Sequence, residues 1–185
     1  YIFMIDNNVL PILHVDGSLT ETKNNIGEVI KVGGIGGYLL ICGKVKEKFS
    51  KNLIEVPYIN YHEEYAIIEG LKWIKEKNID KIQIRSDSIS AIKLFTKQKR
   101  NLSKTDKFFL MQYLMLDFAF EHVEFVYQNR DENDLAHDLS RKYIKEQTKE
   151  KGVHHIPQFK EGELGKKLTK QYLSKSINEI NFFIK

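Results

Sequence analysis

The pattern of apolar and polar positions predicts five β-strands along the chain. Strands are indicated where apolar residues alternate with polar ones, or form short runs between turn residues. In the first segment, His14, Asp16 and Ser18 share one face, whereas Leu13 and Val15 occupy the other. We expect the strands at residues 12–19, 38–45, 49–57, 81–88 and 122–128.

Four further segments show helical periodicity, with apolar residues three and four positions apart. In the first of them, Glu63 lies one turn before Ala66 and Ile67 on the same apolar stripe, which is an unusual place for an acid. Asp87 and Ser88 stand directly before the second, where an N-cap residue is expected. We expect the helices at residues 61–77, 89–95, 105–120 and 132–150.

The order of these elements predicts an α/β fold, a mixed sheet with helices packed on it. The glycines of GGIGGYLL allow a turn or bulge and close backbone approach. The second and third strands are expected to form a hairpin around the charged turn at 44–48. The first and fourth strands can lie side by side, which would bring Asp16 close to Asp87. Periodicity stops in residues 151–165, so we expect one domain over 1–150 and a basic C-terminal extension over 151–185.

Length and charge limit the possible classes of protein. A chain of 185 residues can bury about two-thirds of its unfolded surface. Its single cysteine excludes an internal disulfide, and no apolar run is long enough to span a bilayer, so we expect a cytoplasmic protein without a membrane partner. Lysine and arginine outnumber acids by 11 to 5 in residues 141–185, although the whole chain carries only +4. This basic end is a candidate for contact with phosphate groups.

Three acids on different elements, Asp16, Glu63 and Asp87, are the candidates for catalytic chemistry. If the fold gathers them, their repulsion favours a divalent cation between them, and carboxylate oxygens suit Mg²⁺. Two ions about 4 Å apart can activate water and stabilise the leaving oxygen in phosphodiester hydrolysis. Taken singly, Asp16 fits a turn residue and Asp87 a helix cap, and a rotated helix would turn Glu64 inward instead of Glu63.

Five motifs occur in a fixed order: HVDGS, GGIGGYLL, NYHEEYAIIEGL, SDSISAI and ENDLAHDLS. As an ordered set they resemble type 1 ribonuclease H, in particular its reverse-transcriptase-like branch. The resemblance covers residues 12–144 and implies the ribonuclease H-like fold, a five-stranded mixed sheet flanked by helices. It aligns Asp16, Glu63 and Asp87 with the family's first three metal-binding acids. Glu63 is favoured over Glu64 by its spacing to a following Ala and Leu.

At the fourth metal-binding position the chain departs from this family. The motif ENDLAHDLS places His137 where the family has an acid. Three alternatives remain open. His137 is a direct or water-mediated metal ligand, which would favour Mn²⁺. Otherwise Asp138 or Asp134 takes its place, or His137 serves only in packing. On a helix, Asp134 lies about 60° and Asp138 about 100° from His137, so neither reaches the same point without a shift.

Candidate substrate contacts come mainly from the resemblance. Asn60 falls where the family has an asparagine that touches the hybrid backbone, although Ile59 replaces a second one. Residues 93–107 are basic and lie where some members carry a substrate-binding protrusion. Arg130 stands just before the last helix and is a candidate for phosphate contact. The full set is Gly17, Ser18, Asn60, Ser88, Lys97, Lys99, Arg100, Arg130 and Asn133.

These features predict a metal-dependent endoribonuclease that cleaves the RNA strand of RNA/DNA hybrids with two Mg²⁺ or Mn²⁺ ions. The resemblance implies 5′-phosphate and 3′-hydroxyl products. A non-catalytic nucleic-acid-binding domain is the alternative, because the fourth position is altered, and an enzyme with another substrate is a third. Burying three acids without a metal would cost stability, which favours the enzyme. The sequence does not indicate an oligomeric state.

Overall fold

Five strands and four α-helices follow one another in the predicted order. The computed structural model describes residues 9–23, 27–53, 56 and 58–149, so the expected extension at 151–185 lies outside the described residues. The strands are β1 (Ile12–Lys23), β2 (Val29–Ile41), β3 (Lys44–Leu53), β4 (Lys81–Ser86) and β5 (His122–Tyr127). The helices are α1 (His62–Lys75), α2 (Ile89–Phe95), α3 (Lys104–Asp117) and α4 (Asp134–Lys149). Short 3₁₀ turns, Ile59–Tyr61 and Arg130–Glu132, precede α1 and α4.

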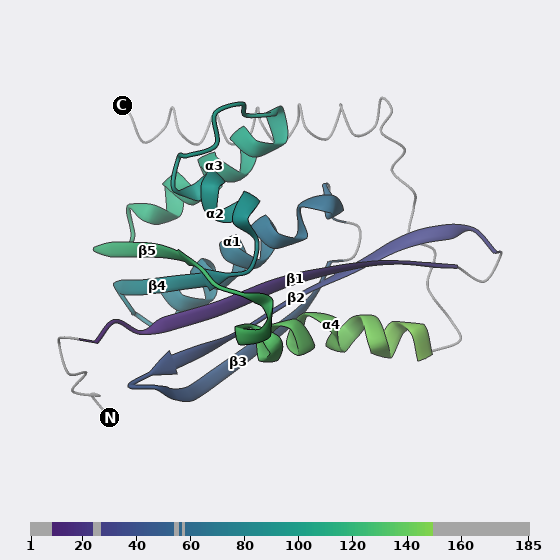
Figure 1. The fold of residues 1–185 in the computed structure, drawn as a ribbon, viewed down its shortest axis with the longest axis horizontal. Coiled ribbons are helices and arrows are strands. Elements are labelled where there is room, and N and C mark those ends of the chain that lie inside the picture. The colour runs from purple at the N-terminus through teal and green to yellow at the C-terminus, as the bar shows by residue number, and fades with distance from the viewer. Residues whose placement is uncertain (1–8, 24–26, 54–55, 57, 150–185) are drawn as a thin grey trace.

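The strands form one mixed sheet in the order β3-β2-β1-β4-β5 (Figure 1). The antiparallel pairs are β1 with β2 and β2 with β3, whereas β1 with β4 and β4 with β5 are parallel. This arrangement confirms the predicted mixed sheet and places the first and fourth strands side by side. Because the parallel strands run the same way, their carboxyl ends lie at one edge, where Asp87 follows β4.

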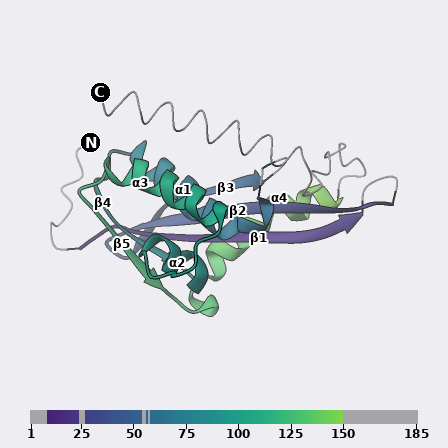
Figure 2. The same cartoon turned by 90° about the horizontal axis from the view of Figure 1, so that it is seen from above.

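Helices cover both faces of the sheet: α1, α2 and α3 lie on one side and α4 on the other (Figures 1 and 2). The alternation in β1 explains this division. Leu13 and Val15 face α1, where a Cβ added to Gly70 would lie 2.9 Å and 3.0 Å from their side chains. Asp16 and Ser18 face α4. The polar face predicted for this strand therefore points to the last helix.

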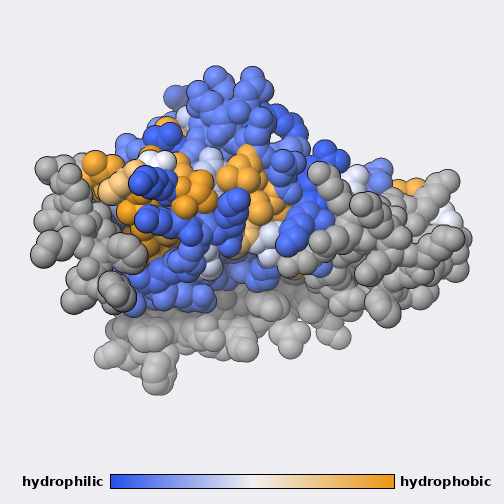
Figure 3. Space-filling view, turned by 90° about the horizontal axis from the view of Figure 1, so that it is seen from below, coloured by the Kyte–Doolittle hydropathy of each residue, from blue (hydrophilic) through white to orange (hydrophobic). Residues whose placement is uncertain are grey.

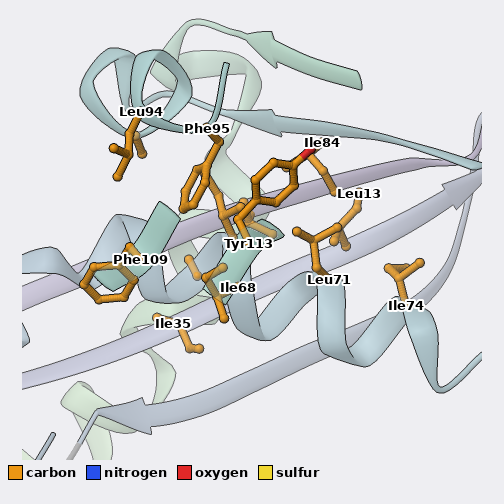
Figure 4. Close-up of a cluster of buried hydrophobic side chains, with 14 of the residues drawn as sticks. Leu13, Ile35, Ile68, Leu71, Ile74, Ile84, Leu94, Phe95, Phe109 and Tyr113 are labelled. Atoms are coloured by element: carbon orange, nitrogen blue, oxygen red, sulfur yellow. The ribbon is translucent and has the colours of Figure 1, made fainter. Parts of the chain in front are cut away.

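The main hydrophobic core lies between the sheet and the helices α1, α2 and α3 (Figure 4). Burial of one such large apolar side chain stabilises the fold by about 1.5–3 kcal/mol. Trp73, expected to serve packing, is partly buried at the edge of this core, with its ring 5.1 Å from that of Phe49. Labelled members of the core in Figure 4 include Leu13, Ile35, Ile68, Leu71, Ile84, Leu94, Phe95 and Phe109.

The glycines of GGIGGYLL lie inside β2 and not in a turn before it. Gly34 and Gly36 face α4, and a Cβ added to Gly36 would lie 2.4 Å from Ser140 N and 2.5 Å from Leu139 C. Their role is close approach of the helix backbone to the sheet. The prediction that this strand begins at residue 38 was wrong, because it took glycines in a central strand as a boundary.

The hairpin turn between β2 and β3 was also placed wrongly. It consists of Cys42 and Gly43, with φ of 51° and 70°, and β3 begins at Lys44. The predicted turn at 44–48 therefore belongs to the strand. Positive φ at both central residues suits the right-handed twist of a two-residue hairpin. The turn was missed because Cys42 and Gly43 continue an apolar run.

Candidate active site

Asp16 lies in the middle of β1 and is only 2% exposed. Its Oδ2 accepts a hydrogen bond of 2.6 Å from the hydroxyl of Ser140 on α4. Ser18 Oγ lies 3.4 Å from the same oxygen, and His137 Nδ1 lies 3.3 Å from it. The carboxylate is thus held by side chains from α4 and from its own strand.

Glu63 comes from the first turn of α1, on the opposite side of β1. Its Oε2 accepts a hydrogen bond of 3.1 Å from the backbone N–H of Gly17. A Cβ at Gly17 would lie 2.4 Å from the His62 carbonyl carbon and 2.8 Å from Glu63 N. Glycine is therefore required next to Asp16 so that the start of α1 can reach the strand.

Asp87 directly follows β4, next to the N-terminus of α2. The cap of this helix is Ser88, whose side chain accepts from Ala91 N at 3.3 Å. Asp87 is therefore free of the capping role that was considered for it. Its Oδ1 is buried and has no hydrogen-bond partner within the described part of the chain. An oxygen buried in this way is suited to bind a cation.

The three acids, Asp16, Glu63 and Asp87, line one pocket. One ligand oxygen from each lies within 4.8 Å of the other two. Burial raises the pKa of Glu63 well above its ordinary value, and the charges of Asp16 and Asp87 raise it further. Burial also raises the pKa of Asp16, although the hydrogen bond from Ser140 opposes this shift. The three carboxylates therefore repel one another, which favours a cation between them.

Glu63, and not Glu64, joins this cluster. Glu64 is buried one residue further along α1, and burial raises the pKa of its carboxyl while the nearby Lys99 opposes the shift. The two neighbouring acids thus lie in different surroundings. The apolar stripe had left both acids open, and the family spacing to Ala66 and Leu71 indicated the one that joins Asp16 and Asp87.

His137 lies at the pocket but not within the acid cluster. Its Nδ1 is 3.3 Å from Asp16 Oδ2, and its Nε2 is 3.1 Å from an Arg130 guanidinium nitrogen. Asp134 and Asp138, the alternatives for the fourth position, are exposed and do not line the pocket. The structure thus brings the histidine, and neither neighbouring acid, next to Asp16.

The predicted substrate contacts fall into two groups. Gly17, Ser18 and Arg130 line the pocket, whereas the others do not. Ser88 caps α2, and Asn133 is fully buried with its amide donating to Val15 O at 2.9 Å. Both residues therefore have structural roles.

The remaining predicted contacts lie away from the acids. Asn60 is exposed and accepts a hydrogen bond of 2.9 Å from Lys31 Nζ. Lys99 pairs with the buried Asp106 at 2.7 Å, at the start of α3. Lys97 and Arg100 are exposed in the segment between α2 and α3. Both belong to the predicted basic stretch, in which Lys99 is already paired with Asp106.

The charged or titratable pocket residues that the sequence did not indicate are His62 and Arg141. The sequence also missed Ser140, which contacts Asp16 but does not line the pocket. Ser140 ends the motif ENDLAHDLS, where the resembling family has alanine, so a hydroxyl at a buried position was the signal. His62 lies beside Glu63 with Nδ1 buried and unpartnered within the described residues, and burial lowers the pKa of its imidazole. Arg141 follows His137 by four residues, so the two share a helix face.

Solved structures share this fold. Ribonuclease H1 from the halophilic archaeon Halobacterium salinarum matches with a TM-score of 0.61 at 18% identity, over 75% of this chain and 99% of its own. The N-terminal RNase H domain of a Mycobacterium tuberculosis protein gives 0.62 at 14% identity, over 76% and 96%. LC11-RNase H1, isolated from compost and solved with an RNA/DNA hybrid, gives 0.61 at 17% identity, over 75% and 99%. At such identities the likeness shows the fold.

A sequence profile gives the family directly. No curated protein sequence matches the chain significantly. The profile of the family described as reverse transcriptase-like matches residues 32–143, which is more than half of the chain. The match includes the motifs that contain Glu63, Asp87 and His137. The chain therefore belongs to the reverse-transcriptase-like branch of the ribonuclease H family.

Proposed function

We propose that this protein is a divalent-metal-dependent endoribonuclease that hydrolyses the RNA strand of RNA/DNA hybrids. The proposal is carried by one observation: Asp16, Glu63 and Asp87, from three separate elements, bring ligand oxygens within 4.8 Å of one another in an open pocket. Family membership supports nucleic-acid processing by a ribonuclease H-like domain. The structurally similar LC11-RNase H1 is in complex with an RNA/DNA hybrid, which supports this substrate.

The acid cluster fits a hard divalent cation such as Mg²⁺ or Mn²⁺. All its donors are carboxylate oxygens, and Asp87 Oδ1 is buried without a protein partner in the described residues. Asp16, Glu63 and Asp87 would hold the metal. We propose two ions, which when bound activate the attacking water and stabilise the leaving oxygen of the phosphodiester.

Residues of the chain fix how these carboxylates face the pocket. The Gly17 N–H donates to Glu63 Oε2, and the Ser140 hydroxyl donates to Asp16 Oδ2. One oxygen of each carboxylate is thereby anchored and the other is left for a ligand. Anchored carboxylates need little rearrangement on ligand binding, because their orientation is already restricted.

We propose that the substrate is recognised mainly through its backbone. A-form-like duplexes are bound by shape, phosphate and 2′-hydroxyl contacts. Gly17, Ser18 and Arg130 line the pocket and would contact the strand that is cut. Lys97 and Arg100, which are exposed between α2 and α3, would contact phosphates further along the duplex. The products would carry 5′-phosphate and 3′-hydroxyl ends.

Cleavage of end-labelled RNA/DNA hybrid tests this function. Single-stranded RNA and duplex DNA are assayed beside it, in Mg²⁺ and then in Mn²⁺. We expect only the hybrid to be cut, and we expect Asp16→Asn to abolish cutting. Asp80→Asn is the matched control, because Asp80 is an exposed acid before β4, at the end of that strand opposite Asp87. Absence of cutting in both metals would refute the enzyme.

His137 favours a second candidate, a nucleic-acid-binding domain without catalysis. Its imidazole stands at the fourth acidic position and contacts Asp16 and Arg130 instead of completing the cluster. Binding of intact hybrid without any cleavage in either metal would favour this candidate. Cleavage that depends on Asp16 would eliminate it.

A further inference from the structure

One wall of the pocket is basic, and it faces the acids. Arg130, from the turn before α4, and His137 and Arg141, from α4 itself, line the same pocket as Asp16, Glu63 and Asp87. We call Arg130, His137 and Arg141 the α4 wall, and we call the three acids the acid wall. No ion pair joins Arg130 or Arg141 to an acid within the described part of the chain. Two guanidinium groups thus border the pocket with their charges unpaired.

The turn that carries Arg130 is anchored on both sides. Before it, the buried Gln128 donates to Asn133 Oδ1 at 2.7 Å and contacts His14 Nδ1 at 2.9 Å. After it, the fully buried Asn133 donates to Val15 O at 2.9 Å. These bonds tie the turn to β1. Arg130 therefore projects from a fixed backbone, although its own side chain is exposed.

His137 connects Arg130 to the acid wall. A guanidinium can only donate hydrogen bonds, so His137 Nε2 must accept the one from Arg130 at 3.1 Å. The ring proton of a neutral His137 is then on Nδ1, which points at Asp16 Oδ2 at 3.3 Å. Both ring nitrogens are thus engaged with protein groups. In this arrangement the histidine orients an arginine, and neither nitrogen is left for a metal.

Arg141 extends the same wall by one helical turn. It follows His137 by four residues, lines the pocket and is exposed. Arg130 uses one of its donors on His137, so the remaining N–H groups of both arginines are available to an anion. Hydrophilic and apolar residues lie side by side on the surface seen from below (Figure 3). The pocket lining itself is mainly charged and polar, which suits a charged strand better than an apolar partner.

We propose that Arg130 and Arg141 form a phosphate subsite for the backbone of a nucleic-acid strand, and that His137 serves as the positioning residue for Arg130. The proposal rests on the proposed function for the identity of the strand. Arginine is suited to this role because its planar donors match two phosphate oxygens at once. At the fourth position the α4 wall would therefore contact the substrate's anion and would not supply a metal ligand.

Hybrid binding in EDTA isolates this subsite from cleavage. Fluorescence anisotropy gives the Kd of a labelled RNA/DNA hybrid over a series of salt concentrations. We expect Arg130→Ala and Arg141→Ala each to reduce the slope of log K against log salt by about 0.7 to 0.9, the value for one lost phosphate contact. Lys44→Ala, which removes an exposed charge at the β2–β3 turn outside the pocket lining, is the matched control and should leave the slope unchanged.

A double-mutant cycle tests the role of His137. If it acts through Arg130, the variant with both His137→Ala and Arg130→Ala binds hybrid no more weakly than Arg130→Ala alone. If the two effects multiply, the positioning role is refuted. Mn²⁺ binding, followed by electron paramagnetic resonance, should be retained in His137→Ala and lost in Asp87→Asn. Loss of Mn²⁺ binding in His137→Ala would make the histidine a ligand and overturn the proposal.

The outcomes separate this inference from the proposed function. Unchanged salt slopes in both arginine variants, with hybrid still cut by the wild type, would overturn the subsite alone. Reduced slopes without any cleavage would keep the subsite and refute the enzyme. Inorganic phosphate is titrated as a competitor against chloride of equal ionic strength. If it binds more tightly than the hybrid in an Arg130-dependent manner, the site takes a free anion and the nucleic-acid assignment fails.

Discussion

The acid wall and the α4 wall face one pocket but are built in different ways. Asp16, Glu63 and Asp87 come from β1, α1 and the end of β4, so the sheet and its first helix bring them together. The α4 wall comes from one turn and the helix that follows it, and it contains His137, which departs from the family pattern at the fourth position. The comparison teaches that the proposed cation site is assembled by the framework of the fold, whereas the opposite wall can change within one short segment.

Separate substitutions of one residue from each wall give the strongest test of this difference. Asp87→Asn removes a ligand oxygen while keeping the side chain's shape. We expect cleavage of the hybrid to fall by roughly 10²- to 10³-fold, because charge stabilisation in the transition state is lost. Arg130→Ala should reduce it only about tenfold, since one phosphate contact is worth less. Single-turnover rates at saturating hybrid give both numbers.

The two substitutions should also separate in metal binding. Titration with Mn²⁺ is expected to detect no binding to Asp87→Asn and unchanged binding to Arg130→Ala. Circular dichroism shows whether both variants keep the wild-type fold. Equal losses of activity and metal binding in both variants would mean that the walls do not have separate roles.

Packing of α4 on the sheet sets the distance between the two walls. A Cβ at Gly36 would lie 2.4 Å from Ser140 N and 2.6 Å from Leu139 Cβ, so Gly36→Ala must push the helix away. Overpacking of this kind costs about 1–3 kcal/mol or more in the free energy of unfolding. Gly43→Ala is the control, because nothing lies within 4 Å of its Cβ position and only its positive φ opposes the change.

Urea unfolding measures both glycine variants. We expect Gly43→Ala to cost about 1 kcal/mol, since alanine is disfavoured at a φ of +70°. Gly36→Ala should cost more and should also weaken hybrid binding, because it displaces the α4 wall. If the two substitutions were equally destabilising, close contact between helix and sheet would not be the reason for glycine in β2.

The acid wall was predictable because period and order are local properties of the sequence. Alternation placed Asp16 on the polar face of β1, and the pairing of the first and fourth strands explained why Asp87 would join it. The helical stripe left Glu63 and Glu64 open, and the choice of Glu63 came from the family resemblance.

The α4 wall could not be predicted in the same way. The contact between Arg130 and His137 depends on side-chain rotamers and on the anchoring of a turn by buried Gln128. Glycines in β2 were compatible with a turn or with close approach, and the backbone of α4, far along the chain, is what requires them. Sequence patterns report an element's own periodicity, whereas side-chain rotamers and contacts between distant segments leave no trace in it.

Without metal, the stability of the folded protein should depend on pH through Glu63 of the acid wall. Burial raises the pKa of Glu63 well above its ordinary 4.5, so without metal the folded protein binds this proton more tightly than the unfolded chain. The resulting stabilisation is complete below pH 4.5 and is lost as pH rises through the raised value. In EDTA, Glu63→Gln should therefore be more stable than the wild type at neutral pH, and this advantage should vanish in acid.

Thermal unfolding between acid and neutral pH, in EDTA and in Mg²⁺, measures this effect. Mg²⁺ at about 100 times its Kd should stabilise the wild type by about 2.7 kcal/mol at neutral pH, and it should not stabilise Glu63→Gln. His137→Ala, from the α4 wall, should keep the response to Mg²⁺. A wild type that is indifferent to both pH and Mg²⁺ would show that the acids are compensated by protein groups alone.

The smallest effect on the proposed function is expected at Ser140, which contacts the acid wall from α4. Ser140 donates to Asp16 Oδ2 at 2.6 Å and lies 2.5 Å from Ser18 Oγ, so Ser140→Ala leaves a buried carboxylate with fewer donors. Near neutral pH this should cost about 1–2 kcal/mol in the free energy of unfolding and weaken Mn²⁺ binding several-fold. Urea unfolding and Mn²⁺ titration measure the two losses. Ser90→Ala, at an exposed serine of α2, is the matched control.

The losses of stability and of Mn²⁺ binding in Ser140→Ala distinguish a packing role of Ser140 from a positioning role. If Ser140 only fills space, alanine leaves Mn²⁺ binding intact and the stability close to that of Ser90→Ala. If its hydroxyl orients Asp16, Mn²⁺ binding falls, and Ser140→Thr, which keeps a hydroxyl, restores part of it. The second result would mean that α4 acts on the metal through the hydroxyl of Ser140, while the arginines of the α4 wall act on the substrate.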